Sequence, residues 1–378
     1  AVESIRLKRL ERDFRQQLER RGLERTEEIQ KLRFLSSDLL AANDMLVIKN
    51  SELTVANQIK SEFLALKQGL VSVIITAYNR DLLLKESLES IYRQTYRNIE
   101  ILLIDDFSFP PLEMVIASTI SSSPFPISIL RTDENLGAGA ARETGRKNAH
   151  GDFIQYLDSD DLLAPYKLER QVQGLADNPD CDISYGRTIM FKNNPPKDIN
   201  ARGCDSYVRT LEHHDKMLPA LLNGRLWATT TPLYRTSLIN KVGPWLPLRI
   251  CEDLEYEYRL GTYSRGLHYV TDTVAMVREH PARLVNNIQE IAGLEDHVTC
   301  YVSVLKNLEA QSVELDFNKY QKFSINLFFL ARKAASLGRG EDMRILITGF
   351  LKINNLSWKR YFNAKIFSLF TRVLGAKQ

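Results

Sequence analysis

Two spacings of hydrophobic residues divide this chain. Over residues 1–68 the apolar positions recur mostly every three or four residues, which is the period of a helix face. From residue 71 onward, short apolar runs alternate with helical stripes. Strands are predicted at residues 71–77, 99–104, 126–130 and 153–157, and helices at residues 81–95 and 137–149. Strands alternating with helices at this interval predict a mostly parallel sheet, with functional residues at the carboxyl ends of the strands.

The first 68 residues contain no proline and a single glycine, Gly22. Their apolar stripe includes Leu32, Leu39, Leu46 and Leu53. A helix of this length has no globular core to lie on, so it is predicted to pair with other copies as a coiled coil, with Asn50 near the seam as a register-fixing polar residue. The alternative is a long helix packed along its own catalytic domain.

Polar residues follow three of the predicted strands directly. The first strand leads into Tyr78-Asn79-Arg80, the second into Asp105-Asp106-Phe107-Ser108, and the fourth into Asp158-Ser159-Asp160-Asp161. Like charges this close raise one another's pKa unless a cation or a set of donors neutralises them, so the last cluster favours a hard divalent metal. The alternative is an acidic loop that caps a helix expected from Leu162 onward, with Pro165 in its first turn.

The turn at residues 135–142 opens a helix with small residues and ends at Arg142. Small side chains let a helix terminus approach a sheet or a ligand closely, and Arg142 could reach a phosphate or a base. The GxGxxG spacing is absent and no P-loop lysine follows. A Rossmann dehydrogenase and a P-loop NTPase are therefore disfavoured.

The second half of the chain is less regular. A helix is predicted at residues 217–226, strands at 227–234 and 267–277, and helices throughout 293–378. The acidic stretch 251–260 marks a helix start, where carboxylates are favoured by the macrodipole even without a catalytic role. The last segment combines aromatic and aliphatic residues with Lys and Arg. It suits an interfacial helix on anionic lipid, or a terminal helix docked on the catalytic domain.

Composition narrows the class of protein. Of the 378 residues, 44% are hydrophobic and 26% charged, and no apolar run reaches the roughly 18 to 20 residues that cross a bilayer. The net charge of +3 is too small to indicate nucleic-acid binding. The four cysteines form no CxxC pair, which argues against a zinc site or a disulfide framework. With no secretory signal at the start, we expect a cytoplasmic protein, peripheral at most on the inner face of the plasma membrane.

In their order, these motifs resemble those of the family 2 inverting glycosyltransferases, which have the GT-A fold of the nucleotide-diphospho-sugar transferase superfamily. The resemblance covers roughly residues 70 to 285. The motifs that carry it are residues 71–80, 105–108, 135–137 with 141–142, 151–161, and 252–253 with Arg259. It implies an α/β fold with a mixed sheet flanked by helices.

The resemblance also implies roles on the donor side of the site. Asp160 matches the direct ligand of Mn²⁺ or Mg²⁺, and Asp158 would contact the ribose or the water shell of the metal. Asp105 or Asp106 would accept from the imide nitrogen of the nucleobase, which favours UDP- or dTDP-sugars. The remaining residues expected along the nucleotide are Ala77, Tyr78, Arg80 and Arg142.

On the acceptor side, Asp253 matches the general base of the family's Glu-Asp pair. Glu252 and Trp245 would lie where the acceptor approaches. His280 falls where some relatives place a histidine near the diphosphate or the metal. Such a site moves a sugar to a hydroxyl of a bacterial surface glycan or a lipid-linked saccharide, with inversion at the anomeric carbon.

Three regions are therefore expected. Residues 1–68 form a coiled coil that joins copies, residues 69–285 the GT-A domain, and residues 286–378 a helical region that associates with membranes. The chain lacks the QxxRW element of processive synthases. The rival interpretations are an inactive GT-A scaffold and a nucleotidyltransferase. The intact Asp158, Asp160 and Asp253 disfavour the first, and the lack of a basic, glycine-rich N-terminal loop disfavours the second.

Overall fold

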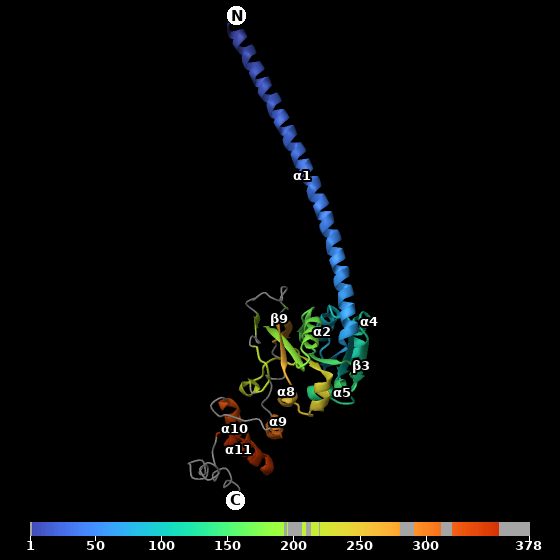
Figure 1. The fold of residues 1–378 in the computed structure, drawn as a ribbon, viewed down its shortest axis with the longest axis vertical. Coiled ribbons are helices and arrows are strands. Elements are labelled where there is room, and N and C mark those ends of the chain that lie inside the picture. Colours follow the sequence, from blue (N-terminus) through green and yellow to red (C-terminus); the bar gives the residue numbers. More distant parts are fainter. Residues whose placement is uncertain are drawn as a thin grey trace. The chain divides into compact units, whose positions relative to one another are not determined.

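The computed structural model describes residues 2–192, 195, 206–208, 213–218, 220–279, 291–310 and 320–354. By its internal contacts the chain divides into two compact units, Ala1–Lys60 and Ser61–Gln378. The first consists of most of helix α1, and the second holds the sheet and the other helices (Figure 1). The first predicted border, at residue 68, lies near this division, whereas the border at 285 falls inside the second unit.

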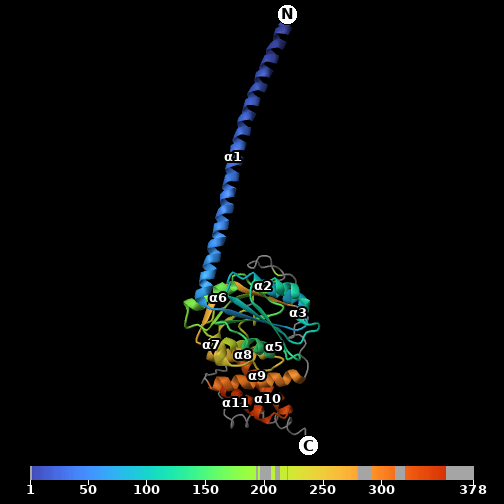
Figure 2. The ribbon, with the colours of Figure 1, turned by 90° about the vertical axis from the view of Figure 1, so that its right-hand side faces the viewer.

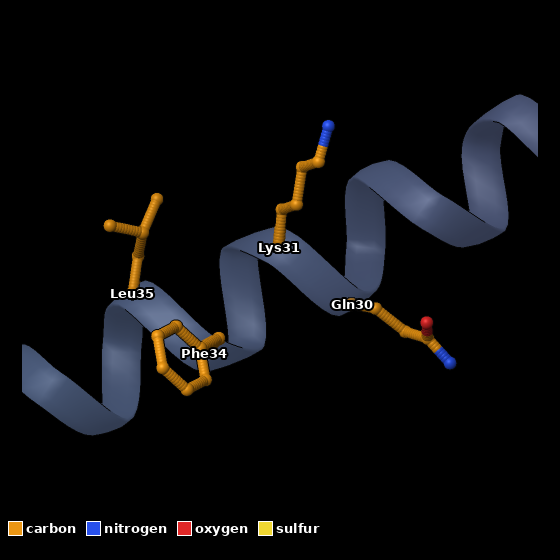
Figure 3. A pocket seen from close by; sticks show the side chains of 4 residues that line it. All are labelled: Gln30, Lys31, Phe34 and Leu35. Atoms are coloured by element: carbon orange, nitrogen blue, oxygen red, sulfur yellow. The ribbon is translucent and has the colours of Figure 1, made fainter.

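Helix α1 runs unbroken from Val2 to Gln68, as the helical spacing predicts. Every side chain in residues 28–54 is exposed, including the leucines of the stripe. Gln30, Lys31, Phe34 and Leu35 line a shallow surface hollow between two pairs of side chains one turn apart (Figure 3). Four side chains of a single helix do not enclose a ligand, so this hollow is a feature of a bare helix surface.

The second unit is built on one mixed sheet. Its strands are β1 Val71–Ala77, β2 Ile99–Asp105, β3 Ile127–Arg131, β4 Phe153–Asp158, β5 Leu162–Leu163, β6 Ile183–Phe191, β7 Ser206–Val208, β8 Leu233–Arg235 and β9 Leu267–Arg278. The order is β3-β2-β1-β4-β8-β6-β9-β5, with β7 paired to β6. The first four strands are mutually parallel, whereas β8 lies antiparallel to both β4 and β6. The predicted α/β fold with a mixed sheet is confirmed.

Helices cover both faces of the sheet (Figure 2). One face carries α2 Asp81–Tyr92, α3 Leu112–Val115, α4 Ala117–Ser121 and α6 Lys167–Asp177, and the other carries α5 Ala138–Lys147, α7 Thr236–Val242 and α8 Glu252–Tyr263. Strand β1 shows why: Val73 and Ile75 belong to the core under the first layer, and Ile74 to the core under the second. A central parallel strand must be apolar on both sides, which its sequence provides.

Three C-terminal helices extend the second core. They are α9 Ile291–Ala310, α10 Gln321–Ser336 and α11 Gly340–Ile353. One continuous cluster of buried side chains reaches from Ile74 of β1 to Ile353 of α11. Among the described residues, no helix has both the length and the apolar character that crossing a membrane requires. The aromatic and basic segment at 358–374 lies outside the described residues.

Several short elements differ from the prediction. No helix begins at Leu162, because Leu162 and Leu163 are buried and pair with β9, and α6 starts only at Lys167. The helix predicted at 217–226 reduces, among its described residues, to a 3₁₀ turn, η1, at Ala220–Asn223. The strand predicted at 227–234 is confined to β8, since residues 228–231 form a turn.

Candidate active site

Three strands end together at one edge of the sheet. Ala77 pairs with Asp105 of β2, and Thr76 pairs with Asp158 of β4. The polar residues that follow these strands therefore meet at a single rim, as the sequence predicts. Ala77 itself is buried, and its carbonyl accepts a hydrogen bond from the backbone N–H of Asp106 at 2.9 Å.

Asp105 is held by donors from its own loop. Its Oδ1 accepts from the backbone N–H of Ser108 at 2.8 Å, and its Oδ2 accepts from that of Leu112 at 3.1 Å and from Arg131. The residue is 2% exposed. This carboxylate fixes the loop after β2, and its predicted contact with a nucleobase stays a prediction.

Asp106 shapes the turn that opens α5. Its carboxylate oxygens accept from the backbone N–H groups of Leu136 and Gly137, each at 2.9 Å, and from the hydroxyl of Thr132 at 3.1 Å. Gly137 has φ +86°, a left-handed conformation that favours glycine. The asparagine-leucine-glycine turn of the sequence is thus joined to the rim by Asp106.

Aromatic side chains stand open at the same edge. Tyr78 after β1 and Phe107 after β2 are each 47% exposed. The guanidinium of Arg131, at the end of β3, lies 5.3 Å from the Phe107 ring. Exposed aromatic rings such as these can stack on a flat heterocycle. The sequence indicated Tyr78 as a contact of the nucleotide and included Phe107 in the 105–108 motif without a role. Arg131 was missed, although it lies at a strand end of the same rim.

Arg142 of α5 connects the rim to α8. Its guanidinium donates to Asp158 Oδ1 at 2.7 Å and to Glu252 Oε1 at 3.0 Å, and lies 5.0 Å from the Trp245 ring. Burial by itself would lower the pKa of Arg142, but the neighbouring charges of Asp158, Glu252 and Asp253 raise it instead. One buried cation therefore lies among carboxylates from two distant parts of the chain.

The small residues at the start of α5 make this approach possible. A Cβ at Gly139 would lie 2.9 Å from the carbonyl oxygen of Leu246 and 3.1 Å from the Cβ of Glu252. Only glycine allows the helix to come this close to the loop before α8. The close packing predicted for the turn is found, and its partner is the loop before α8 with the first residue of that helix.

Asp160 pairs with Arg80, the last residue before α2. The next residue, Asp161, has a structural role, because its carboxylate accepts from the hydroxyl of Thr230 at 2.7 Å and from the backbone N–H of Arg278 at 3.1 Å. Asp161 thereby ties the acidic turn to β9. The three aspartates that look alike in sequence have different surroundings.

Asp158 and Asp160 supply the hard oxygen donors that Mn²⁺ and Mg²⁺ prefer. Such ions often use only one or two carboxylates and take their other ligands from water and phosphate, so this donor set fits. Within the part of the chain that the structure describes, no group of three or more His, Cys, Asp or Glu side chains is arranged to hold a metal ion. His280 lies outside the described residues.

Asp253 lies in the first turn of α8 and pairs with Arg225, which also donates to Glu257 at 3.0 Å. The residue before it, Glu252, accepts from Arg142, whose guanidinium also donates to Asp158. The predicted base is therefore one residue away from a side chain that shares Arg142 with the predicted donor side. Arg225 was missed, because it lies 28 residues from Asp253 and a helical pattern does not show which side chains meet across such a separation.

The carboxyl group of Glu252 has a raised pKa. Burial, and next the charge of Asp253, raise its pKa to about 7, although Arg142 acts in the opposite direction. Arg142 is shared with Asp158, so it does not neutralise Glu252 fully. At neutral pH this carboxyl is thus present in both protonation states.

Trp245 is only 5% exposed. Its ring stacks on Tyr256 with centroids 3.9 Å apart, and its indole N–H donates to the Tyr156 hydroxyl at 3.0 Å. It therefore packs against Arg142 of α5, Tyr256 of α8 and Tyr156 of β4. A direct contact with an acceptor stays a prediction.

Comparisons with known proteins bear on the family and the fold of this chain. The sequence model described as glycosyl transferase family 2 matches residues 72–235. An uncharacterized glycosyltransferase of Rickettsia typhi is 37% identical over 254 residues, 65% of this chain and 74% of that protein. The Escherichia coli UDP-Glc:alpha-D-GlcNAc-diphosphoundecaprenol beta-1,3-glucosyltransferase WfgD is 35% identical over 125 residues, 33% of this chain and about half (48%) of that protein.

The fold has a solved counterpart. S. aureus TarS 1–349 in complex with UDP-GlcNAc superposes with a TM-score of 0.55 at 17% identity, covering 81% of this chain and 91% of that one. At this identity the likeness concerns the fold, which is the predicted GT-A architecture. With the family match and the Rickettsia relative, it leads to one conclusion: the chain belongs to glycosyl transferase family 2 and is a glycosyltransferase.

Proposed function

We propose that this enzyme transfers a sugar from a UDP- or dTDP-sugar to a hydroxyl of a bacterial saccharide or lipid-linked saccharide, with inversion. The observation that carries the proposal is that Arg142 binds both Asp158 and Glu252, the residue before Asp253. It brings the side of the site expected to bind the donor next to the side expected to activate the acceptor. The name of WfgD, a UDP-Glc transferase to a diphosphoundecaprenol-linked sugar, supports this substrate class.

On the donor side, Asp158 and Asp160 would hold a Mn²⁺ or Mg²⁺ ion, whose charge stabilises the leaving nucleoside diphosphate. Arg142 pairs with Asp158, and Arg80 pairs with Asp160. Guanidinium groups bind phosphate oxygens as well as they bind carboxylates. We infer that both arginines contact the diphosphate when the donor is bound. Tyr78 and Phe107 offer their exposed rings to the nucleobase.

On the acceptor side, Asp253 would remove the proton from the attacking hydroxyl. A sugar hydroxyl has a pKa far above neutrality, so its attack on the anomeric carbon needs a positioned base. Arg225 pairs with Asp253 and with Glu257, and thereby fixes the carboxylate of Asp253 at the start of α8. A single in-line displacement inverts the configuration and needs no enzyme nucleophile.

Two substitutions test the division of roles. Asp160→Ala is expected to abolish the Mn²⁺-dependent rise in melting temperature that a UDP-sugar causes. Asp253→Asn is expected to keep that rise and to lower turnover by roughly 10³-fold, because only the proton acceptor is removed. A panel of nucleotide sugars in the same assay identifies the donor. Equal loss of donor binding in both variants would contradict the assignment.

The rival proposal, an inactive scaffold, predicts a different outcome in that experiment. Such a protein would bind a UDP-sugar without transferring or hydrolysing it, and Asp253→Asn would change nothing. The wild-type side chains of Asp158, Asp160 and Asp253 are all present, which favours the active enzyme.

We further propose that α1 joins copies of the chain as a coiled coil. Leu32, Leu39, Leu46 and Leu53 recur every seven residues and are all at least 59% exposed. Asn50, three residues before Leu53, suits the register-fixing polar position of such a seam. The stripe is thus an exposed apolar surface that the same stripe of a second copy would bury.

Paired charge insertions test this proposal. Leu39→Asp with Leu46→Asp is expected to convert the oligomer to a monomer in light scattering, because a buried carboxylate in the seam is not neutralised. Ser37→Asp with Ser51→Asp adds the same charge outside the stripe and is expected to leave the mass unchanged. A wild-type monomer at micromolar concentration would contradict the coiled coil.

The segment after residue 354 is proposed to bring the enzyme to an anionic membrane surface. It contains aromatic residues, Lys and Arg but no acidic residue. Vesicles with phosphatidylserine should sediment the full chain but not a chain that ends at residue 354. Equal sedimentation of both would show that this segment is not what binds lipid.

A further inference from the structure

Hydrogen bonds join the loop after β1 to the loop after β2 at two places. At the strand ends, the backbone N–H of Asp106 donates to the carbonyl of Ala77 at 2.9 Å. Two residues further along both loops, the backbone N–H of Asn79 donates to the hydroxyl oxygen of Ser108 at 2.9 Å. In each loop, the single residue between these two contacts is aromatic and exposed. Both exposed rings of the rim are therefore carried by backbone that is bonded on either side.

The side chain of Asn79 adds a third bond between the loops. Its Oδ1 accepts from the backbone N–H of Phe109 at 2.8 Å. The residue before, Ser108, is buried, and its backbone N–H donates to Asp105 Oδ1 at 2.8 Å while its carbonyl accepts from Arg131 at 2.7 Å. The loop after β2 is thus held by β2 itself, by the end of β3 and, from across the rim, by Asn79.

Phe107 is the residue that depends on these bonds. Its φ of +68° lies in the left-handed region, which is uncommon for a bulky side chain. Asn79 has φ +50°, and asparagine tolerates this region better than most residues. Such conformations persist where surrounding contacts fix them, and they are found at ligand sites. The Phe107 ring is 47% exposed, so its position follows from the backbone that carries it.

We propose that Asn79 is a positioning residue for the donor: its side chain holds the loop after β2 so that the Phe107 ring meets the nucleobase of the bound nucleotide. This role rests on the proposed function, which takes a UDP- or dTDP-sugar as the donor. Asn79 acts through the bond from Phe109 and not by touching the nucleotide. Without that bond the loop has further conformations open to it. The fraction of protein that is ready to stack on the base then falls, and the apparent affinity falls with it.

Calorimetric titration of the full chain with UDP and Mn²⁺ measures this effect. Asn79→Ala removes the acceptor for Phe109 and is expected to raise the Kd of UDP roughly fivefold or more, because stacking of a base on an aromatic ring contributes at least such a factor. Asn79→Gly allows the left-handed φ but also lacks the acceptor, so it should raise the Kd as well. An Asn79→Gly variant within about twofold of wild type would overturn the role of the side chain.

Asn148→Ala is the matched control. Asn148 is also exposed, and its side chain also bonds to the backbone, donating to the carbonyl of Thr144 at 2.8 Å. It lies at the C-terminal end of α5, whereas the start of α5 faces the rim. Its replacement is expected to leave the Kd of UDP unchanged, and a loss equal to that of Asn79→Ala would contradict a specific role for Asn79.

A double-mutant cycle decides whether Asn79 acts through the ring. Phe107→Ala is expected to raise the Kd of UDP by at least as much as Asn79→Ala does. In the Phe107→Ala background, Asn79→Ala should then change the Kd by less than about twofold, since no ring is left to position. A general structural role of Asn79 predicts the same factor in both backgrounds, and that result would refute the proposal.

Hydrogen exchange of the nucleotide-free chain, followed by mass spectrometry, examines the loop directly. The peptide with residues 105–112 should exchange faster in Asn79→Ala than in wild type, because the loop opens more often. Equal exchange in both would show that Asn79 does not hold the loop. Failure of the proposed function gives a different result: wild type would not bind UDP with Mn²⁺, and the donor role of Asn79 would fall with it. An Asn79→Ala variant that binds UDP as tightly as wild type overturns the role of Asn79 alone.

Discussion

At the residue scale, one guanidinium serves several carboxylates. Arg142 donates to Asp158 at 2.7 Å and to Glu252 at 3.0 Å. A carboxylate that shares its cationic partner with a second carboxylate is neutralised less fully, so it keeps its proton to a higher pH. The raised pKa of Glu252, about 7, follows from this competition, from burial and from Asp253. The contacts of Arg142 therefore influence both the pKa of Glu252 and the positions of Asp158 and Glu252.

The stability of the protein should show this raised pKa. Glu252 ordinarily titrates near 4.5, so between that value and about 7 the native state holds a proton that the unfolded state has lost. Stability from this group is full below pH 4.5 and is lost as pH rises through 7. Glu252→Gln does not titrate and can still accept from Arg142. Its unfolding free energy relative to wild type should rise by on the order of 2 to 3 kcal/mol from pH 5 to pH 8, measured by urea unfolding. A difference that does not change with pH would show that Glu252 has an ordinary pKa.

The planar fork of Arg142 should matter more than its charge. Arg142→Lys keeps one positive charge but cannot donate to Asp158 and Glu252 in the same geometry, so kcat/KM for transfer is expected to fall roughly 10- to 100-fold. Arg146→Lys, one turn along α5 and paired with Glu143, is the matched control and should cost less than twofold. Similar losses in both variants would mean that α5 simply tolerates no lysine.

Sequence reasoning finds the charged residues at strand ends but not their partners. The rim is predictable because strand ends are visible in the apolar pattern and lie together in any parallel sheet. The internal bonds of Asp105 are not, since they depend on a loop conformation that no periodicity encodes. Arg225 is missed because its pairing with Asp253, 28 residues along the chain, depends on the tertiary fold.

At the element scale, long periodic segments are predictable and short ones are not. Strands β1 to β4 follow from runs of apolar residues that must be buried on both sides, and they lie within a residue of the predicted bounds. Two residues, Leu162 and Leu163, are too few for their sequence to predict a strand. They form one because they pair with β9. Tertiary partners decide such elements.

The start of α5 offers a test at this scale. Gly139→Ala places a Cβ 2.9 Å from the Leu246 carbonyl oxygen, so α5 and the loop before α8 must separate. We expect a loss of about 1 to 3 kcal/mol of stability and a lower transfer rate, because Glu252 begins the helix that follows this loop. Gly340→Ala, at the start of α11 where a Cβ meets nothing within 4 Å, should be neutral or slightly stabilising. A stable and active Gly139→Ala would show that the loop yields freely.

At the scale of the whole molecule, the C-terminal helices belong to the catalytic unit. The buried cluster runs through α8, α9, α10 and α11 without a break. Two sets of polar contacts reinforce it: Asp296 holds the loop before α8, and the Ser303 hydroxyl donates to Glu255 at 2.6 Å. The sequence could assign helices to this region but not their partner, since an amphipathic face does not state what covers it.

Two truncations separate the roles of the ends. A chain that stops at residue 290 loses the apolar cover of α8, the Ser303 hydroxyl that donates to Glu255, and the Asp296 carboxylate that holds the 249–250 backbone. Cooperative unfolding should then be lost or its midpoint lowered by more than about 10 °C. A chain that starts at residue 61 lacks only the first compact unit, and its midpoint in differential scanning calorimetry should stay within about 2 °C of the full chain at the same protomer concentration. The chain that stops at residue 290 could instead unfold as cooperatively as the full chain. In that case α9 would not stabilise the second unit, and its hydrogen bonds to the loop before α8 could not be what positions Glu252 and Asp253.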